Sequence, residues 1–277
     1  MKKNLTLLLS AFIGFVQAQD MCCTLTATDE FAHMAQNNGF AMLHEIPAPY
    51  IHQSGAGKMI EFPTSDGQKG NAFYLEANQK SNKYLFVIHE WWGLNSHIKK
   101  EAERLYSALD NVNVMAIDLY DGNVATTRED AMKYIRQVES DRAGSIITGA
   151  GDFAGDNAKI ATIGWCFGGG WSLQAALISG SKTIGCVIYY GTPEKDVERL
   201  KTLHSDVLGI FALHDGGIGP DVVAQFQKDM IAAEKSVTVH SFDAAHAFAN
   251  PSSSRYKEEE AQAANKLALE YLKKKFQ

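Results

Sequence analysis

The residues with the clearest potential for chemistry lie in a glycine-rich turn around Cys166. Residues 163–171 read Ile-Gly-Trp-Cys-Phe-Gly-Gly-Gly-Trp, between a strand-like apolar stretch and a helix-like one. A strand that turns sharply into a helix lifts the central side chain out of the bend, as in a nucleophile elbow. The helix N-terminus also favours a thiolate and a developing oxyanion. The pattern predicts a cysteine nucleophile, and a buried structural cysteine is the alternative.

A cysteine nucleophile needs a base, and the base needs a group that orients it. Asp215 follows the apolar stretch 207–213, and His246 follows the stretch 237–242. Both residues would therefore stand on loops at the carboxyl ends of strands, in the order nucleophile, acid, histidine of an α/β hydrolase. We expect Cys166, His246 and Asp215 to form a catalytic triad. Taken singly, Asp215 could be a turn residue and His246 a hydrogen-bonded loop histidine.

Other residues of the same types are expected to have structural roles. Asp221 is expected to begin a helix, and Asp243 lies on the same loop as the histidine, so neither is favoured as the triad acid. His89 and His214 each precede a site acid, and we expect both to be packed structural histidines.

A second oxyanion donor is expected after the stretch 84–88, where an α/β hydrolase supplies one. The backbone N–H groups of Trp91 and Phe167 are the candidates. Glu90 beside them is unusual, because a carboxylate near a thiol raises the pKa of the thiol unless the two share a proton. A solvated loop acid is the alternative for Glu90. Trp91 and Trp92 could line a pocket for a flat apolar substrate or pack in the core.

The elements that position these residues alternate along the chain. Strands are expected near 58–62, 70–77, 84–89, 112–118, 159–165, 184–190, 207–213 and 237–242. Helices are expected near 97–109, 128–139, 169–179, 220–234 and 255–275, and an amphipathic helix near 29–43. Alternating strands and helices predict a mostly parallel sheet with helices on both faces, whose ligands bind beyond the carboxyl ends of the strands.

The N-terminus has the features of a signal peptide. Lys2 and Lys3 precede an apolar run from Leu5 to Val16, and small residues then allow cleavage after Ala18. The run is short for a membrane span, so an uncleaved anchor is the less favoured alternative. We expect residues 1–18 to be the signal, 19–57 an N-terminal extension and 58–277 the hydrolase domain, in an exported protein that is periplasmic or secreted.

Composition limits the partners. The 277 residues are 45% hydrophobic and 21% charged, which fits one large globular domain. The net charge is −6, and loss of the two lysines in residues 1–18 makes it −8. Nucleic acids and anionic membranes require a basic patch, so neither is expected as a partner. The cysteines are Cys22, Cys23, Cys166 and Cys186. They do not suggest a disulfide scaffold, and oxidation of an exported Cys166 is a real hazard.

The motifs together resemble the dienelactone hydrolase family over roughly residues 58–275. The resemblance rests on the runs from His89 to Asn95, from Asp118 to Tyr120 and from Ile163 to Gly169, with the pair His214-Asp215 and the run from Ala245 to Phe248. It implies an α/β-hydrolase fold, a Cys166–His246–Asp215 triad, and Glu90 helping to deprotonate the thiol when substrate enters. It also implies hydrolysis of an enol-lactone of the carboxymethylenebutenolide type through an acyl-cysteine, without a metal or organic cofactor.

The expected substrate-binding residues are Arg128, Trp92, Tyr120 and Asn250. Family members that act on dienelactone bind its carboxylate with two arginines, and Arg128 matches the first in local sequence. Asn250 stands where the second is expected. An asparagine donates a hydrogen bond but lacks the charged fork that recognises a carboxylate. A general carboxylesterase or thioesterase on the same triad is therefore the alternative enzyme, and a non-catalytic thiol redox or binding protein is the alternative of another class. A small-molecule ester or lactone is the expected partner, and the chain is expected to be a monomer.

Overall fold

The computed structural model describes residues 27–36 and 45–277. The expected signal at residues 1–18, together with Cys22, Cys23 and Leu43, lies outside these residues. No helix within the two described ranges is long and apolar enough to cross a membrane.

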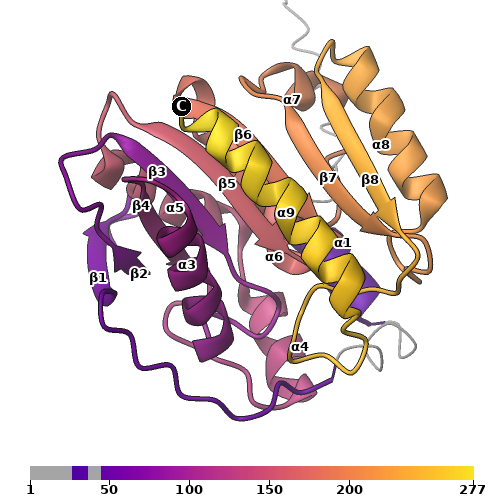
Figure 1. The fold of residues 1–277 in the computed structure, drawn as a ribbon, viewed down its shortest axis with the longest axis horizontal. Coiled ribbons are helices and arrows are strands. Elements are labelled where there is room, and N and C mark those ends of the chain that lie inside the picture. Colours follow the sequence, from indigo (N-terminus) through magenta and orange to yellow (C-terminus); the bar gives the residue numbers. More distant parts are fainter. Residues whose placement is uncertain (1–26, 37–44) are drawn as a thin grey trace, which may run out of the picture.

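An eight-stranded sheet forms the centre of the molecule (Figure 1), with strand order β1-β2-β4-β3-β5-β6-β7-β8. The strands are β1 Lys58–Pro63, β2 Lys69–Leu75, β3 Lys83–Ile88, β4 Asn113–Asp118, β5 Lys159–Trp165, β6 Thr183–Tyr189, β7 Val207–Ala212 and β8 Val237–Phe242. β2 is antiparallel to both β1 and β4, and the remaining pairs are parallel. The carboxyl ends of β3, β5, β7 and β8 therefore meet at one edge of the sheet.

Helices cover both faces of the sheet. Those of the main domain are α3 Ser96–Ala108, α4 Arg128–Gln137, α5 Ser140–Ala154, α6 Phe167–Ile178, α7 Val197–Lys201, α8 Pro220–Ala232 and α9 Glu258–Lys275, with the short 3₁₀ helix η1 at Gly180–Lys182. Figure 1 shows α3 and α9 on the near face, with α5 and α6 behind the sheet. The extension contributes α1 Ala27–Ala35, which packs against α6 and α4. The mostly parallel, doubly covered sheet is the α/β-hydrolase fold that the sequence predicted.

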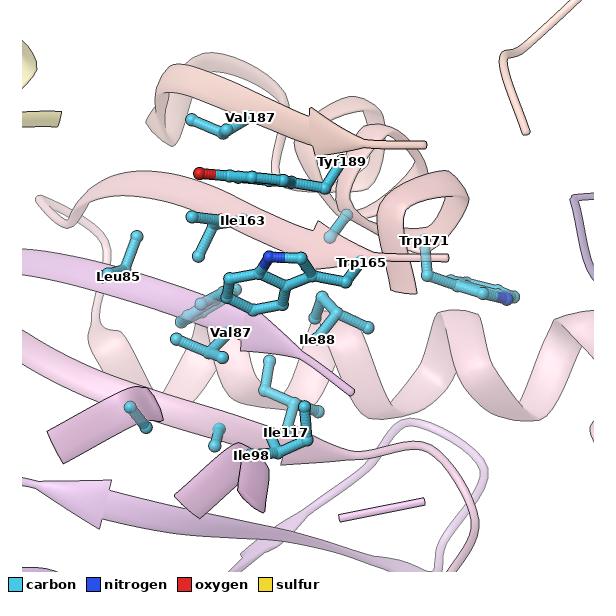
Figure 2. Packing of buried hydrophobic residues seen from close by; sticks show 14 of the residues in the cluster. Leu85, Val87, Ile88, Ile98, Ile117, Ile163, Trp165, Trp171, Val187 and Tyr189 are labelled. Atoms are coloured by element: carbon cyan, nitrogen blue, oxygen red, sulfur yellow. The ribbon is translucent and has the colours of Figure 1, made fainter. Parts of the chain in front are cut away.

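The apolar strands form the core. Every residue of β4 and β7 is buried, which explains their uninterrupted apolar sequences. Figure 2 shows Trp165 at the carboxyl end of β5 beside Ile88 and Tyr189, and the rings of Trp165 and Tyr189 are 5.4 Å apart. Because Trp165 and Cys166 are consecutive, this anchored ring fixes the point at which β5 turns into α6.

Two helices and several element ends differ from expectation. The sequence analysis missed α5 and α7, and α9 begins at Glu258 rather than near residue 255. The residues of α5 are rich in glycine, alanine and serine, which weakens its amphipathic pattern. Small residues are needed there, because a Cβ on Gly149 would lie 2.5 Å from the carbonyl oxygen of Pro63 in β1.

Candidate active site

Cys166 occupies a strained turn between β5 and α6. It is the N-cap of α6 and has φ 58° and ψ −120°, a combination that side-chain-bearing residues rarely adopt. The turn is tight because a Cβ on Gly164 would lie 1.9 Å from the carbonyl oxygen of Gly168. The backbone N–H of Cys166 donates to the carbonyl of Tyr189 in β6 at 3.0 Å. The elbow predicted for Cys166 is therefore present, held by close contact between β5 and α6.

The thiol of Cys166 lies in a closed, polarised environment. Cys166 is 1% exposed, and its sulfur accepts hydrogen bonds from the backbone N–H groups of Phe167 and Trp91. Burial and the charge of Glu90 raise the pKa of the thiol well above its usual range, against the opposing effect of these two hydrogen bonds. The helix N-terminus favours a thiolate, whereas burial and the charge of Glu90 favour the neutral thiol. The two N–H groups expected to bind an oxyanion do converge on its sulfur.

His246 and Asp215 form a buried pair. Nδ1 of His246 lies 2.5 Å from Oδ2 of Asp215, and both side chains are fully buried. Oδ1 of Asp215 accepts hydrogen bonds from the backbone N–H groups of Gly217 at 2.8 Å and Ile218 at 3.0 Å. Burial raises the pKa of Asp215, but the charge of His246 and these hydrogen bonds outweigh it and lower the pKa. Asp215 is thus an ionised group that fixes the orientation of the imidazole.

Glu90 is a buried acid rather than a solvated one. Its residue is 7% exposed, and burial raises its pKa to about 7, although the charge of His246 and a hydrogen bond from Asn250 act in the opposite direction. Its charge acts on the Cys166 thiol. A carboxyl group with this pKa can hold or accept a proton near neutral pH.

Asn250 is already engaged by the protein. Its Nδ2 donates to Oε2 of Glu90 at 2.6 Å. Its Oδ1 accepts from the backbone N–H of Ser252 at 2.8 Å and from the Ser252 hydroxyl at 2.7 Å. In the structure the amide of Asn250 holds the carboxyl group of Glu90, and the residue also lines the pocket beside Glu90. Binding of substrate by Asn250 stays a prediction.

The side chains of Trp91, Trp92 and Tyr120 are buried in the core, next to the backbone N–H groups expected to bind an oxyanion. The two indole rings meet edge to face at 4.9 Å, and both residues are buried. The hydroxyl of Tyr120 donates to the carbonyl oxygen of Trp91 at 3.1 Å. This hydrogen bond holds the residue that supplies one candidate oxyanion donor, and binding of substrate by Tyr120 stays a prediction.

Arg128 is the first residue of α4 and is half-buried. The hydroxyl and N–H of Ser254, and then the charges of Arg255 and Arg128, lower the pKa of Glu45 despite an opposing desolvation effect. Arg128 therefore lies near a carboxylate of the N-terminal extension. The position four residues after His246, where a second arginine was expected, holds the uncharged Asn250.

The residues expected to be structural behave differently from one another. His89 is buried, with Nε2 accepting from the N–H of Leu119 at 3.1 Å and Nδ1 lying 2.6 Å from the carbonyl oxygen of Glu90. His214 was expected to be packed, but its side chain is 66% exposed and pairs with Asp243 at 2.5 Å. Asp243 is thereby on the surface. Asp221 lies in the first turn of α8, as expected.

Tyr190 belongs to the site and was missed by the sequence analysis. It is fully buried with φ 36°, and its ring is 5.0 Å from that of His246. Burial, and then the charges of Glu90 and Cys166, raise the pKa of its hydroxyl well above the usual range. Its position at the carboxyl end of β6, beside β5, was the signal that could have identified it.

A pocket of about 310 Å³ adjoins Glu90. It is lined by residues of α3, by the loop after β8 and by the start of α9, among them Asn95, His97, Lys100, Asn250, Tyr256 and Asn265. Within residues 27–36 and 45–277, no cluster of three or more His, Cys, Asp or Glu side chains is arranged to hold a metal ion. The arrangement of thiol, imidazole, carboxylates and backbone donors suits acyl transfer.

Comparison with known proteins assigns the family. The sequence profile of the dienelactone hydrolase family matches residues 71–276. The chain belongs to the dienelactone hydrolase family. It is 26% identical to a putative carboxymethylenebutenolidase of Saccharolobus solfataricus, over 77% of this chain and 97% of the relative. It is 22% identical to carboxymethylenebutenolidase 1 of Cupriavidus pinatubonensis, over 77% of this chain and 95% of the relative.

Solved structures show the same fold. A putative dienelactone hydrolase from Klebsiella pneumoniae superposes with a TM-score of 0.65 at 21% identity, over 79% of this chain and 99% of that one. A dienelactone hydrolase-like promiscuous phosphotriesterase from metagenomic libraries has a TM-score of 0.68 at 20% identity, over 80% of this chain and 100% of that one. As a member of the dienelactone hydrolase family, the protein is a hydrolase that acts on ester or lactone bonds.

Proposed function

We propose that this hydrolase cleaves an activated ester or a lactone through an acyl-cysteine intermediate on Cys166. The observation that carries the proposal is the convergence of two backbone N–H groups, from Phe167 and Trp91, on the sulfur of a strained elbow cysteine. Nearby, the His246–Asp215 pair supplies a base with a fixed orientation. Relatives named carboxymethylenebutenolidase support a lactone of that type as the first substrate to test.

The reaction would begin with loss of the thiol proton. The Glu90 carboxylate draws the proton from the sulfur as substrate enters, and the proton passes to His246. The thiolate then forms a bond to the carbonyl carbon, while the N–H groups of Phe167 and Trp91 stabilise the oxyanion. The carbon–oxygen bond to the leaving group breaks, and His246 protonates the departing oxygen.

Water completes the cycle. His246 takes a proton from a water molecule, whose oxygen attacks the carbonyl carbon of the thioester. The carbon–sulfur bond breaks, the carboxylic acid leaves, and the protonated His246 returns its proton to the thiolate. Asp215 keeps the imidazole in place throughout and stabilises its protonated form.

A general carboxylesterase or thioesterase activity is the second candidate. The Glu90–Asn250 hydrogen bond of 2.6 Å favours it, because the amide at this position is occupied and carries no positive charge. A carboxylate-bearing lactone would lack the bidentate partner that an arginine provides there.

A substrate panel tests the proposal under reducing conditions. The panel compares cis- and trans-dienelactone with p-nitrophenyl acetate and an acyl thioester. Cys166→Ala should abolish hydrolysis, whereas Cys186→Ala, which removes a buried thiol from β6, should leave it nearly unchanged. Preference for the uncharged ester or thioester would support the second candidate. Unchanged hydrolysis by Cys166→Ala would refute the acyl-cysteine mechanism, and reversible thiol oxidation without any hydrolysis would favour a redox or binding role.

We also propose that the protein is exported and that the mature chain begins at Gln19. The lysines followed by a short apolar run and small residues near Ala18 support this. The mass of the protein recovered from the cell envelope or medium tests it, and a full-length mass there would contradict cleavage at this position.

A further inference from the structure

Helix α1 of the N-terminal extension packs onto the residues of the reaction centre. The ring of Phe31 lies 6.3 Å from that of Trp91 and 5.7 Å from that of Phe167, measured between centroids. These are the two residues whose N–H groups contact the Cys166 sulfur. Phe31 is 1% exposed, so its ring fills the apolar space beside the candidate oxyanion hole.

Thr28 and Glu30 make polar contacts between α1 and the domain. Nε1 of Trp171 donates to Oγ1 of Thr28 at 2.9 Å in a buried hydrogen bond. Figure 2 shows Trp171 apart from the packed side chains around Trp165. An ion pair of 2.8 Å also joins Glu30 to Lys195, whose side chain is 64% exposed. An exposed ion pair of this kind contributes at most about 1 kcal/mol. Among the described residues of α1, Phe31 and Ala35 are buried in the core, so apolar packing contributes to its attachment.

A second part of the extension borders the pocket beside Glu90. Residues 45–57 run past α3 toward β1 (Figure 1). The carbonyl oxygen of Ala48 lies 2.9 Å from Nε2 of His97, and Lys100 lies over the ring of Tyr50 at 5.4 Å. His97 and Lys100 both line the pocket. The extension thus contacts the two residues that donate to the thiol and two residues that line the pocket.

The reaction centre is closed in this arrangement. Cys166 is 1% exposed and His246 is fully buried, so an ester carbonyl can reach the sulfur only when groups packed around it move. Phe31 is one of these groups, because its ring packs on both residues that donate to the sulfur. We propose that α1 is a removable cover of Cys166 and that Phe31 is the specificity-determining side chain, which limits the acyl group that the site admits. The role of Phe31 in limiting the acyl group rests on the proposed acyl-cysteine function. The role of α1 as a cover of the thiol does not depend on that function.

Alkylation of the thiol tests the cover without requiring turnover. The full chain is treated with iodoacetamide, and modification of the Cys166 peptide is followed by mass spectrometry. Phe31→Ala should accelerate this modification at least tenfold. Thr28→Val retains the ring and loses only the hydrogen bond to Trp171, so it should give a smaller increase and provides a second variant if Phe31→Ala folds poorly.

Phe226→Ala is the matched control, because it removes an equally buried ring from α8 in a separate core cluster. Equal rates in wild type, Phe31→Ala and Thr28→Val would overturn the cover, and so would an equal acceleration in Phe226→Ala. Hydrolysis of p-nitrophenyl hexanoate relative to the acetate gives the acyl-size test. We expect the ratio to rise at least fivefold in Phe31→Ala, and an unchanged ratio would overturn the specificity role. Faster alkylation without hydrolysis in any variant would support the cover and count against the proposed function.

Discussion

At the residue scale, the carboxyl group of Glu90 and the thiol of Cys166 are both buried. Burial disfavours the charged form of each group. Burial raises the pKa of Glu90 to about 7 and the pKa of Cys166 well above its usual range. A neutral thiol is a weak nucleophile and resists oxidation, because the thiolate is the reactive form. The site therefore protects Cys166 at rest, and substrate must help to create the thiolate.

The pKa of Glu90 predicts the pH dependence of hydrolysis. If the carboxylate of Glu90 accepts the thiol proton, kcat/KM should rise as pH increases through about 7, because Glu90 is protonated below that pH. Glu90→Gln should lower kcat/KM by about 10²-fold and remove this limb of the profile. If kcat/KM of Glu90→Gln still rises through the same pH, the rise belongs to the titration of another group.

Asn250 should tune this profile. Its hydrogen bond to Glu90 lowers the pKa of that carboxyl group, in opposition to burial. Asn250→Leu should therefore move the rising limb of kcat/KM to higher pH. Gln225→Leu is the control, because Gln225 is exposed on α8 and its amide donates to Asp229 rather than to Glu90. This variant should leave the rising limb of kcat/KM unmoved. A shift to lower pH in Asn250→Leu would contradict the role given to this hydrogen bond.

At the element scale, the elbow depends on how closely β5 and α6 approach. Gly164→Ala places a Cβ 1.9 Å from the carbonyl oxygen of Gly168, a clash with backbone that no rotamer relieves. We expect a loss of at least about 3 kcal/mol in the free energy of unfolding, measured by denaturant titration. Gly151→Ala in α5 meets nothing within 4 Å and should be neutral or stabilising by up to about 1 kcal/mol. Similar stabilities for the two variants would contradict this account of the turn.

Strands were easier to predict than helices and contacts. The strands β3, β4 and β7 are built on continuous apolar runs, so their bounds follow closely from the sequence. Helix α5 was missed because close packing against β1 selects small residues that hide its periodicity. The Glu90–Asn250 hydrogen bond joins residues 160 positions apart, and no local pattern encodes it. The contact of Phe31 with the oxyanion-hole residues likewise depends on where α1 docks.

At the scale of the whole molecule, two buried carboxyl groups make opposite contributions to stability. The pKa of Asp215 is lowered in the folded state, so its contribution is present above the unfolded pKa and is lost as pH falls through the folded pKa. The pKa of Glu90 is raised from 4.5 to about 7, so ionisation of the unfolded chain reduces stability across this interval. This shift corresponds to about 3 kcal/mol at alkaline pH.

Thermal unfolding of two variants should separate these contributions. Relative to wild type, Glu90→Gln should gain stability between pH 5 and pH 8, because it cannot carry the buried charge. Asp215→Asn should lose the most stability at neutral pH and become similar to wild type in acid. Parallel curves of Tm against pH for wild type and Glu90→Gln would contradict the raised pKa of Glu90.

The acyl-enzyme itself is the most direct test of the central claim. The wild-type protein is mixed with p-nitrophenyl acetate, quenched in acid within the first turnover and digested for mass spectrometry. We expect one acetyl group on the peptide that contains Cys166, accompanied by a stoichiometric burst of p-nitrophenol, and neither signal in Cys166→Ala. Turnover without an acyl group on Cys166, or a burst that persists in Cys166→Ala, would contradict the acyl-cysteine mechanism.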